Sequence, residues 1–140
     1  MPTDFTSVRL HLDGGPLLVE AVRTAVRFQA AHAGLDDETS GKIANASDGV
    51  CREALLQLTD GDPGLDVLID TFADRIEVSI HHRGQLVPAV GLEAFAHSEG
   101  PQGSSGVKGA ELLAQVDRVM FNSEGGVART TLLKFLQPKP

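Results

Sequence analysis

Residues 65–82, LDVLIDTFADRIEVSIHH, decide the fold. Apolar side chains occupy every second position in both halves of this stretch, and Asp74-Arg75 separates the halves. A period of two residues is typical of a half-buried strand, and polar residues between two such runs indicate a turn. The stretch therefore predicts an antiparallel hairpin with strands at Leu65–Phe72 and Ile76–His82.

One strand and two helices are predicted ahead of this hairpin. Ser7–Asp13 alternates between apolar and polar residues, which predicts a half-buried strand. Over Leu17–Ala33 apolar side chains recur at helical spacing, and Gly34 is suited to end that helix. A second helix opens at Asp36-Asp37-Glu38, whose carboxylates favour the positive end of the helix dipole, and extends to Leu58.

The segment after the hairpin changes in composition. Gly84–Val107 is rich in Gly, Ser, Pro and Ala, and its middle has no apolar residue. Long segments of this kind in a compact domain are functional loops or disordered. We expect a flexible lid over about 97–107 and a disordered tail at 137–140.

A third helix and a second hairpin are predicted to close the chain. Helical spacing resumes over 110–117, and strands at Val119–Asn122 and Val127–Leu136 flank the turn residues Glu124-Gly125-Gly126. The order β-α-α-β-β-loop-α-β-β predicts an α/β (α+β) two-layer sandwich. Its sheet is expected to be mixed but mostly antiparallel, with about three helices on one face.

Composition narrows the function. The chain has 140 residues, with 12 Lys and Arg against 19 Asp and Glu, so its net charge is −7. Its length predicts one domain over 1–140. The acidic balance argues against a nucleic-acid partner, and the short apolar runs argue against a membrane span. With no visible secretory leader and Cys51 as its single cysteine, we expect a cytoplasmic domain without disulfides or a multi-cysteine zinc site.

The order of elements, with a glycine-rich loop before the last helix, resembles the GHKL (Bergerat-type, histidine-kinase-like) ATPase domain. Within that family the chain is most similar to the small anti-sigma-factor serine kinases of bacterial partner-switching systems, over nearly its whole length. The resemblance implies an ATP and Mg²⁺ cleft between the second and third helices, beneath the lid.

In that family the second helix carries an acid that activates the attacking hydroxyl, followed one turn later by an Asn that holds Mg²⁺. The matching stretch here is Ala46–Ala54, ASDGVCREA, in which Gly49 replaces the acid and Glu53 replaces the Asn. Glu53 is the candidate magnesium ligand if Mg·ATP binds, because Mg²⁺ takes oxygen ligands. Asp48 and Arg52 have the same spacing, but Arg cannot bind a cation. We therefore assign no catalytic residue.

Two further family boxes bind nucleotide. An Asp-x-Gly-x-Gly box reads the adenine amino group, and the matching run 82–86 has His82 in place of the Asp. A Gly-x-Gly at the start of the last helix cradles phosphates, and 106–109 supplies glycines and a lysine there. The candidate nucleotide-binding residues are Glu53, His82, Gly84, Gly106, Lys108 and Gly109.

Each candidate also has a purely structural interpretation. Glu53 is then a solvated or ion-paired residue on the helix flank, and Cys51 an inert core thiol. His81 and His82 are adjacent on a strand and point to opposite faces, which argues against a shared metal site. The glycines of 100–109 also fit a mobile loop without a ligand.

Three functions are compatible with these residues. The first is an anti-sigma-factor-like regulator that binds a sigma factor or an anti-sigma antagonist, with degenerate or absent use of ATP and no cofactor expected. The second is an active serine/threonine protein kinase that uses ATP and magnesium to phosphorylate an antagonist protein. The third is a structural oligomerisation domain. The resemblance also implies a homodimer, since family members pair through their first strand and first helix.

Overall fold

The structure, a computed structural model, describes residues 6–13, 18–57, 64–83 and 115–136. Its elements are, in order, β1 (Thr6–Leu12), α1 (Leu18–His32), α2 (Asp37–Gln57), β2 (Leu65–Thr71), β3 (Arg75–Arg83), β4 (Arg118–Glu124) and β5 (Val127–Phe135). The expected lid at 97–107, the expected tail at 137–140 and most of the expected third helix at 110–117 lie outside the described residues. Within that expected helix Gln115 is helical, and the chain has left the helix by Val116.

The five strands form one sheet in the order β1-β2-β3-β5-β4. Leu65 lies opposite His82, so the predicted hairpin over 65–82 is confirmed. The second hairpin turns at Gly125 and Gly126, whose φ angles of 60° and 81° fit a type I′ turn. The pairings of the described strands are all antiparallel, where we had expected a mixed sheet.

The ends of the helices are fixed by local hydrogen bonds. At the end of α1, Gly34 has a φ of 109°, and the N–H of Leu35 donates to the carbonyl of Ala30 at 3.1 Å. This is a Schellman ending, so the predicted role of Gly34 is confirmed. At the start of α2 the Asp36 carboxylate accepts a hydrogen bond from the N–H of Thr39 at 2.7 Å, which lowers the pKa of Asp36.

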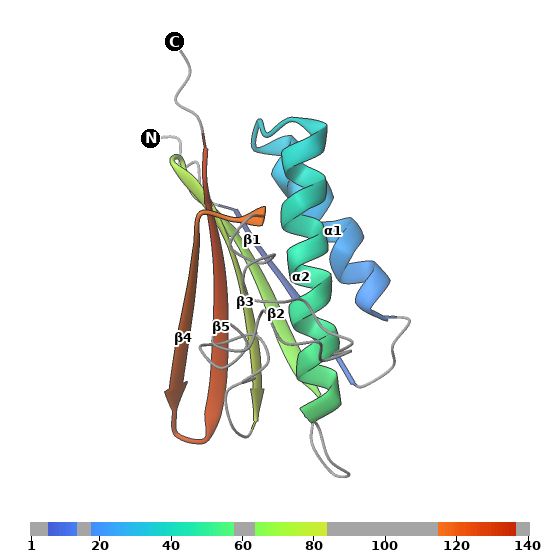
Figure 1. Ribbon diagram of the computed structural model, residues 1–140, viewed down its shortest axis with the longest axis vertical. Helices are drawn as coiled ribbons and strands as arrows, with labels where there is room; N and C mark the ends of the chain where they lie inside the picture. Colours follow the sequence, from blue (N-terminus) through green and yellow to red (C-terminus); the bar gives the residue numbers. More distant parts are fainter. Residues whose placement is uncertain (1–5, 14–17, 58–63, 84–114, 137–140) are drawn as a thin grey trace, which may run out of the picture.

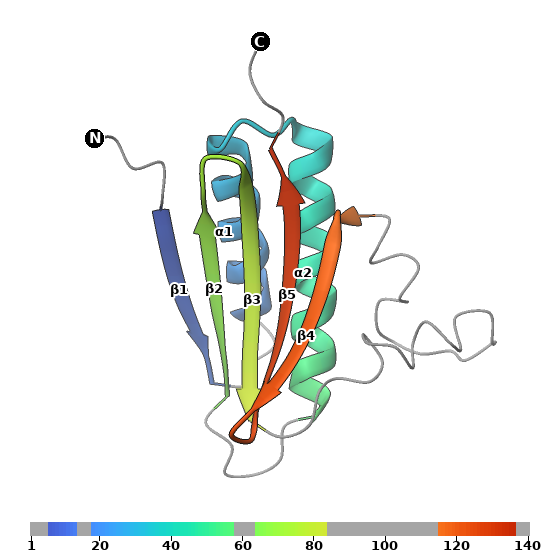
Figure 2. The ribbon, with the colours of Figure 1, turned by 90° about the vertical axis from the view of Figure 1, so that its left-hand side faces the viewer.

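The molecule has two layers, with α1 and α2 packed side by side on one face of the sheet (Figure 1). α1 covers β1 and β2, and α2 covers β3 and β5 (Figure 2). The two-layer sandwich predicted from the sequence is therefore confirmed. Neither of the two described helices is long and apolar enough to cross a membrane.

Strand alternation assigns the side chains to two faces of the sheet. The inner face, towards the helices, forms the core with the apolar stripes of α1 and α2; its largest fully buried members include Leu12, Ile43, Leu65, Ile69, Ile76, Ile80 and Leu132. The strand register places on the outer face, away from the helices, Ser7, Arg9, His11, Asp66, Leu68, Asp70, Arg75, Glu77, Ser79, His81, Arg83, Arg118, Met120, Asn122, Val127, Arg129, Thr131, Leu133 and Phe135.

Candidate functional site

The candidate site lies where α2 faces β3 and β5. α2 packs on both strands, and its C-terminal end lies at the same end of the molecule as the end of β3 (Figures 1 and 2). Since β5 is antiparallel to β3, it begins at this same end. Polar side chains on these three elements are therefore the ones available to a ligand between α2 and the sheet.

The carboxylates of α2 lie on two different flanks of the helix. Asp48 accepts a hydrogen bond from Arg52 Nε at 2.9 Å, and Arg52 reaches Glu20 of α1 at 3.6 Å. Residues five apart on a helix differ by about 140° in direction, so Glu53 points away from Asp48. Asp48 is thus directed to α1 and does not replace the acid missing at Gly49.

Glu53 is buried on the flank turned away from α1, with 5% of its surface exposed. No hydrogen bond or ion pair joins it to another residue within the described ranges, and burial raises the pKa of its carboxyl. The interpretation of Glu53 as a solvated residue is therefore wrong. Burial therefore makes ionisation of this carboxyl, the form that binds Mg²⁺, less favourable than it is in water. One turn earlier, Gly49 is buried as well and offers no side chain.

His82 lies on the inner face of β3 and is 3% exposed. Its Nδ1 is 3.1 Å from the carbonyl oxygen of Arg83, and only a protonated Nδ1 can donate there. In the neutral ring Nε2 is then an acceptor. Nε2 is buried and has no hydrogen-bond partner among the residues that the structure describes. The ring can therefore accept a hydrogen bond from an amino group, which is the task of the family's Asp.

His81 points to the outer face of the sheet, where Asp66 and Arg129 lie opposite it on the neighbouring strands. The prediction that the two histidines point to opposite faces is confirmed. Among the residues in the described ranges, no group of three or more His, Cys, Asp and Glu side chains could hold a metal ion.

Thr130 is a polar residue of this region that the sequence analysis missed. It lies on the inner face of β5, opposite Ile80 and diagonal to His82, where side chains are about 7 Å apart. Thr130 is 1% exposed, and its Oγ1 has no hydrogen-bond partner. The sequence does contain a sign of this burial. Thr130 stands two residues after Ala128 and two before Leu132, so the alternation of the strand assigns it to the core face.

The other candidates, Gly84, Gly106, Lys108 and Gly109, lie outside the described residues. Of the candidate nucleotide-binding residues, the structure thus places Glu53 and His82, on the facing elements α2 and β3. No hydrogen bond connects their side chains. Cys51 is a buried core thiol, as expected, and burial raises its pKa to about 12.

A nucleotide fits this set of residues only in part. His82 and Thr130 offer unpaired polar atoms of the kind that bind a base. Mg²⁺ is usually bound through one or two ionised carboxylates together with phosphates, whereas Glu53 is a single buried carboxyl with a raised pKa. At Gly49 nothing can activate a hydroxyl. The arrangement is better suited to weak binding of a base than to phosphoryl transfer.

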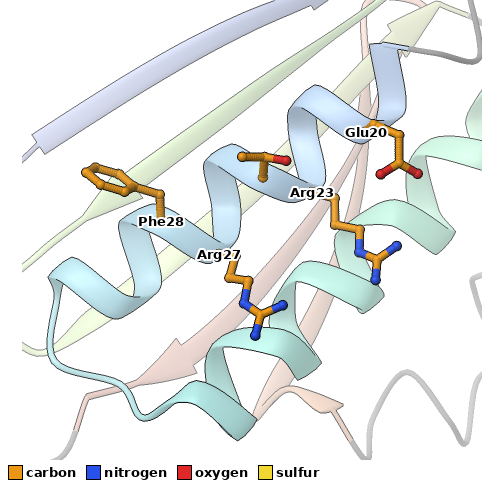
Figure 3. A pocket seen from close by; sticks show the side chains of 5 residues that line it. Glu20, Arg23, Arg27 and Phe28 are labelled. Carbon is orange, nitrogen blue, oxygen red and sulfur yellow. The ribbon is translucent and has the colours of Figure 1, made fainter.

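A shallow groove of about 300 Å³ runs along the exposed side of α1. Its lining residues are Glu20, Arg23, Thr24, Arg27 and Phe28. Figure 3 shows Arg23 and Arg27 extending towards α2 and Phe28 pointing away from them. Arg27 is paired with Asp37 of α2 at 2.8 Å, and Phe28 is 63% exposed. The groove is open and mostly charged, which distinguishes it from an enclosed small-molecule pocket.

Comparison with known proteins gives a likeness in fold. No protein-family model and no curated protein sequence matches the chain. Among solved structures it is similar to the crystal structure of the RsbU and RsbW domains of Rv1364c from Mycobacterium tuberculosis, with a TM-score of 0.67 and 20% sequence identity. The match covers 95% of this chain and 33% of that chain, so the present chain spans about a third of its length. At this identity the likeness shows the fold alone.

Proposed function

We propose that this domain is an anti-sigma-factor-like regulator of a bacterial partner-switching system, which binds a regulatory protein and makes weak or no use of ATP. The observation that carries the proposal is the flank of α2 at the candidate site. There Gly49 takes the place of the activating acid, and Glu53 is buried with a raised pKa. Phosphoryl transfer is catalysed mostly by positioning and electrostatics, and this flank supplies little of either.

The fold supports the class of protein. A solved structure that includes an RsbW domain shares the fold over 95% of this chain. The sequence independently resembles the anti-sigma-factor serine kinases in the order of its elements. Both observations concern the scaffold, and neither depends on the altered nucleotide boxes. A scaffold kept without its catalytic acid is consistent with a domain selected for binding a protein.

One observation favours the alternative of an ATP-dependent kinase. Nε2 of His82 and Oγ1 of Thr130 are buried without a hydrogen-bond partner among the described residues, on diagonally opposed positions of β3 and β5. Buried polar atoms without partners are costly, and a bound base would satisfy them. This alternative needs an acid that α2 does not supply at Gly49. A domain that binds the base of a nucleotide but does not transfer its phosphate would account both for the unpaired polar atoms and for the missing acid.

Calorimetric titration with Mg·ATP tests the proposal. We expect no heat beyond dilution, or a dissociation constant of about 1 mM that does not change when EDTA replaces magnesium. Any weak binding should be lost in His82→Ala and kept in the matched control His32→Ala, whose histidine is exposed on α1. Tight, magnesium-dependent binding would contradict the proposal. Recovery of a sigma factor or a small antagonist on co-purification would support it over a purely structural role.

We also propose that two copies pair through β1 and α1. β1 is the edge strand of the described sheet. On α1, Leu18 and Phe28 are 38% and 63% exposed, with Ala21 and Ala25 between them at helical spacing. An open strand edge beside an apolar stripe is a site for pairing with another chain.

The oligomeric state tests this pairing. Light scattering after size exclusion should give the mass of a dimer for the wild-type chain and of a monomer for Phe28→Glu. Leu56→Glu is the matched control, because Leu56 is equally exposed but lies on α2. A monomeric wild-type chain, or a dimer that Phe28→Glu leaves intact, would rule out this interface.

A further inference from the structure

The outer face of the sheet carries several residues of the types that are enriched in protein interfaces, together with Asp66, Asp70 and Glu77. Five arginines and no lysine lie on this face of the described strands: Arg9, Arg75, Arg83, Arg118 and Arg129. Met120 and Phe135 are 40% and 45% exposed on the same face. Arginine, methionine and aromatic residues are enriched in interfaces, whereas lysine is depleted there.

Two of these arginines lie together at the end of β3. Arg129 is directly opposite His81, and Arg83 is the next outer-face residue after His81 along β3. Neither arginine forms an ion pair with another described side chain. Most other described cations do, as in the pairs Arg27–Asp37 and Lys134–Asp117. Within the part of the chain that the structure describes, no carboxylate neutralises the two guanidinium groups.

Among the acids on this face whose side chains the structure describes, the nearest one is already engaged. Asp66 lies 2.8 Å from Nδ1 of His11 and 3.4 Å from Arg9, and these partners keep the pKa of its carboxyl low. Asp66 therefore does not neutralise Arg83 and Arg129. The pKa of His81 is lowered by burial and, next, by the charge of Arg129, as expected where positive charge is in excess.

Apolar side chains border the two arginines. Val127 lies directly opposite Arg83 and is 37% exposed, and Met120 lies on β4, opposite Thr131 of β5. The whole chain has a net charge of −7, so the remainder outside the two arginines is more negative still. A long polyanion such as a nucleic acid would be repelled by that remainder. A short acidic and apolar segment is compatible with the local positive charge.

We propose that the surface formed by Arg83, Arg129, His81, Met120 and Val127, the basic sheet surface, binds an acidic segment of a partner protein. This inference deepens the proposed function. It rests on that function in one respect, namely that the bound molecule is a regulatory protein. The guanidinium groups of the two arginines of the basic sheet surface would each bind a carboxylate through two parallel hydrogen bonds. Met120 and Val127 would bury apolar side chains of the same segment. The face is separate from the α2 site, which lies on the other side of the sheet.

The test uses the whole chain and a defined probe, a short synthetic peptide in which Glu alternates with Leu. On titration into the isotopically labelled chain, amide shifts should change at the end of β3, the start of β5 and Met120. The dissociation constant should rise about tenfold in Arg83→Glu/Arg129→Glu and rise with added salt. It should stay within about twofold in Arg23→Glu, because Arg23 is exposed on α1 without an ion pair to another described side chain.

Three outcomes of the peptide experiments would overturn the inference. The first is that a peptide with Gln in place of Glu binds as tightly as the Glu peptide. The second is that amide shifts change only in α1 or α2. The third is that Arg23→Glu loses as much affinity for the peptide as Arg83→Glu/Arg129→Glu does. Tighter binding of a single-stranded oligonucleotide of the same charge would also overturn it, in favour of a nucleic-acid partner. The double variant should leave the Mg·ATP titration unchanged, so failure here is distinguishable from failure of the proposed function.

Discussion

The two flanks of α2 differ in the ion pairs that their acidic side chains form with other described residues. On the flank facing α1, Arg52 pairs with Oδ2 of Asp48 at 2.9 Å and with Glu20 at 3.6 Å, while Oδ1 of Asp48 is buried without a hydrogen-bond partner. On the other flank Glu53 is buried without a partner among the described residues, and the nearby strands carry unpaired atoms of His82 and Thr130.

This difference separates what the fold requires from what it does not. The carboxylates of Asp48 and Glu20, which share Arg52, link α2 to α1. Glu53 has no such pair among the described residues, and burial raises the pKa of its carboxyl, so this flank contributes no comparable ion pair to the packing of the helices. The predictions below test the contrast, beginning with the largest effect.

The first prediction concerns Cys51, on the α1 flank. Its pKa is raised from 9.0 to about 12, so its thiolate fraction near neutral pH is about a thousandfold below that of a free cysteine. A thiol reagent should label the native chain only as fast as it unfolds. The matched control is Asn45→Cys in a Cys51→Ala background, since Asn45 is exposed on the same helix. Native labelling of Cys51 at the rate of that control would show that this flank is open.

The second prediction concerns the core between the flanks. Ile43 is fully buried on α2, and Ile43→Ala should lower the free energy of unfolding by about 3 kcal/mol through lost burial and a cavity. Leu56→Ala, on the same helix but 66% exposed, should change it by less than about 0.5 kcal/mol. Urea unfolding monitored by circular dichroism measures both. Equal effects would mean that α2 does not pack as described.

The third prediction concerns the ion pairs of the α1 flank. Asp48→Asn removes the partner of Arg52 and should cost about 0.5 kcal/mol of stability, because the pair is partly exposed. The loss should shrink in high salt as the charges are screened. If the loss of stability does not depend on salt, its cause is not the ion pair between Asp48 and Arg52.

The fourth and smallest prediction concerns Glu53. Its pKa in the folded state is raised above 4.5, so folding favours the protonated acid. The stability from this group is fully present below the unfolded pKa and is lost as pH rises through the folded pKa. Glu53→Gln should therefore be slightly more stable than wild type at neutral pH and equal to it in acid. Urea unfolding at both pH values checks this, and a variant less stable at neutral pH would reveal a partner for the carboxylate.

Most of the fold could be predicted because local patterns set it. Alternation in 65–82 and the glycines at 125–126 specify the two hairpins, and both are present in the sheet. Gly34 ends α1 where helical spacing stops. The purely antiparallel sheet was not predicted, since pairing between β1 and β2 joins strands separated by two helices and no local signal encodes it.

The site was predicted less well because its properties depend on tertiary packing. Glu53 occupies a helical position that sequence alone cannot distinguish as solvated or buried, and the structure buries it. Thr130 has a β-branched side chain that suits a strand on either face. Its proximity to His82 follows only from the register of β3 and β5. The clustering of Arg83 and Arg129 on the outer face depends on the same register.

The most direct measurement of the central claim is phosphoryl transfer. The chain is incubated with Mg·ATP labelled at the γ-phosphate, together with any protein that co-purifies with it, and phosphoserine is quantified. Because Gly49 leaves no acid at the activating position, we predict that no label is transferred. Label on a serine of the bound protein, lost in Glu53→Gln and His82→Ala, would contradict the claim and identify the domain as a working kinase.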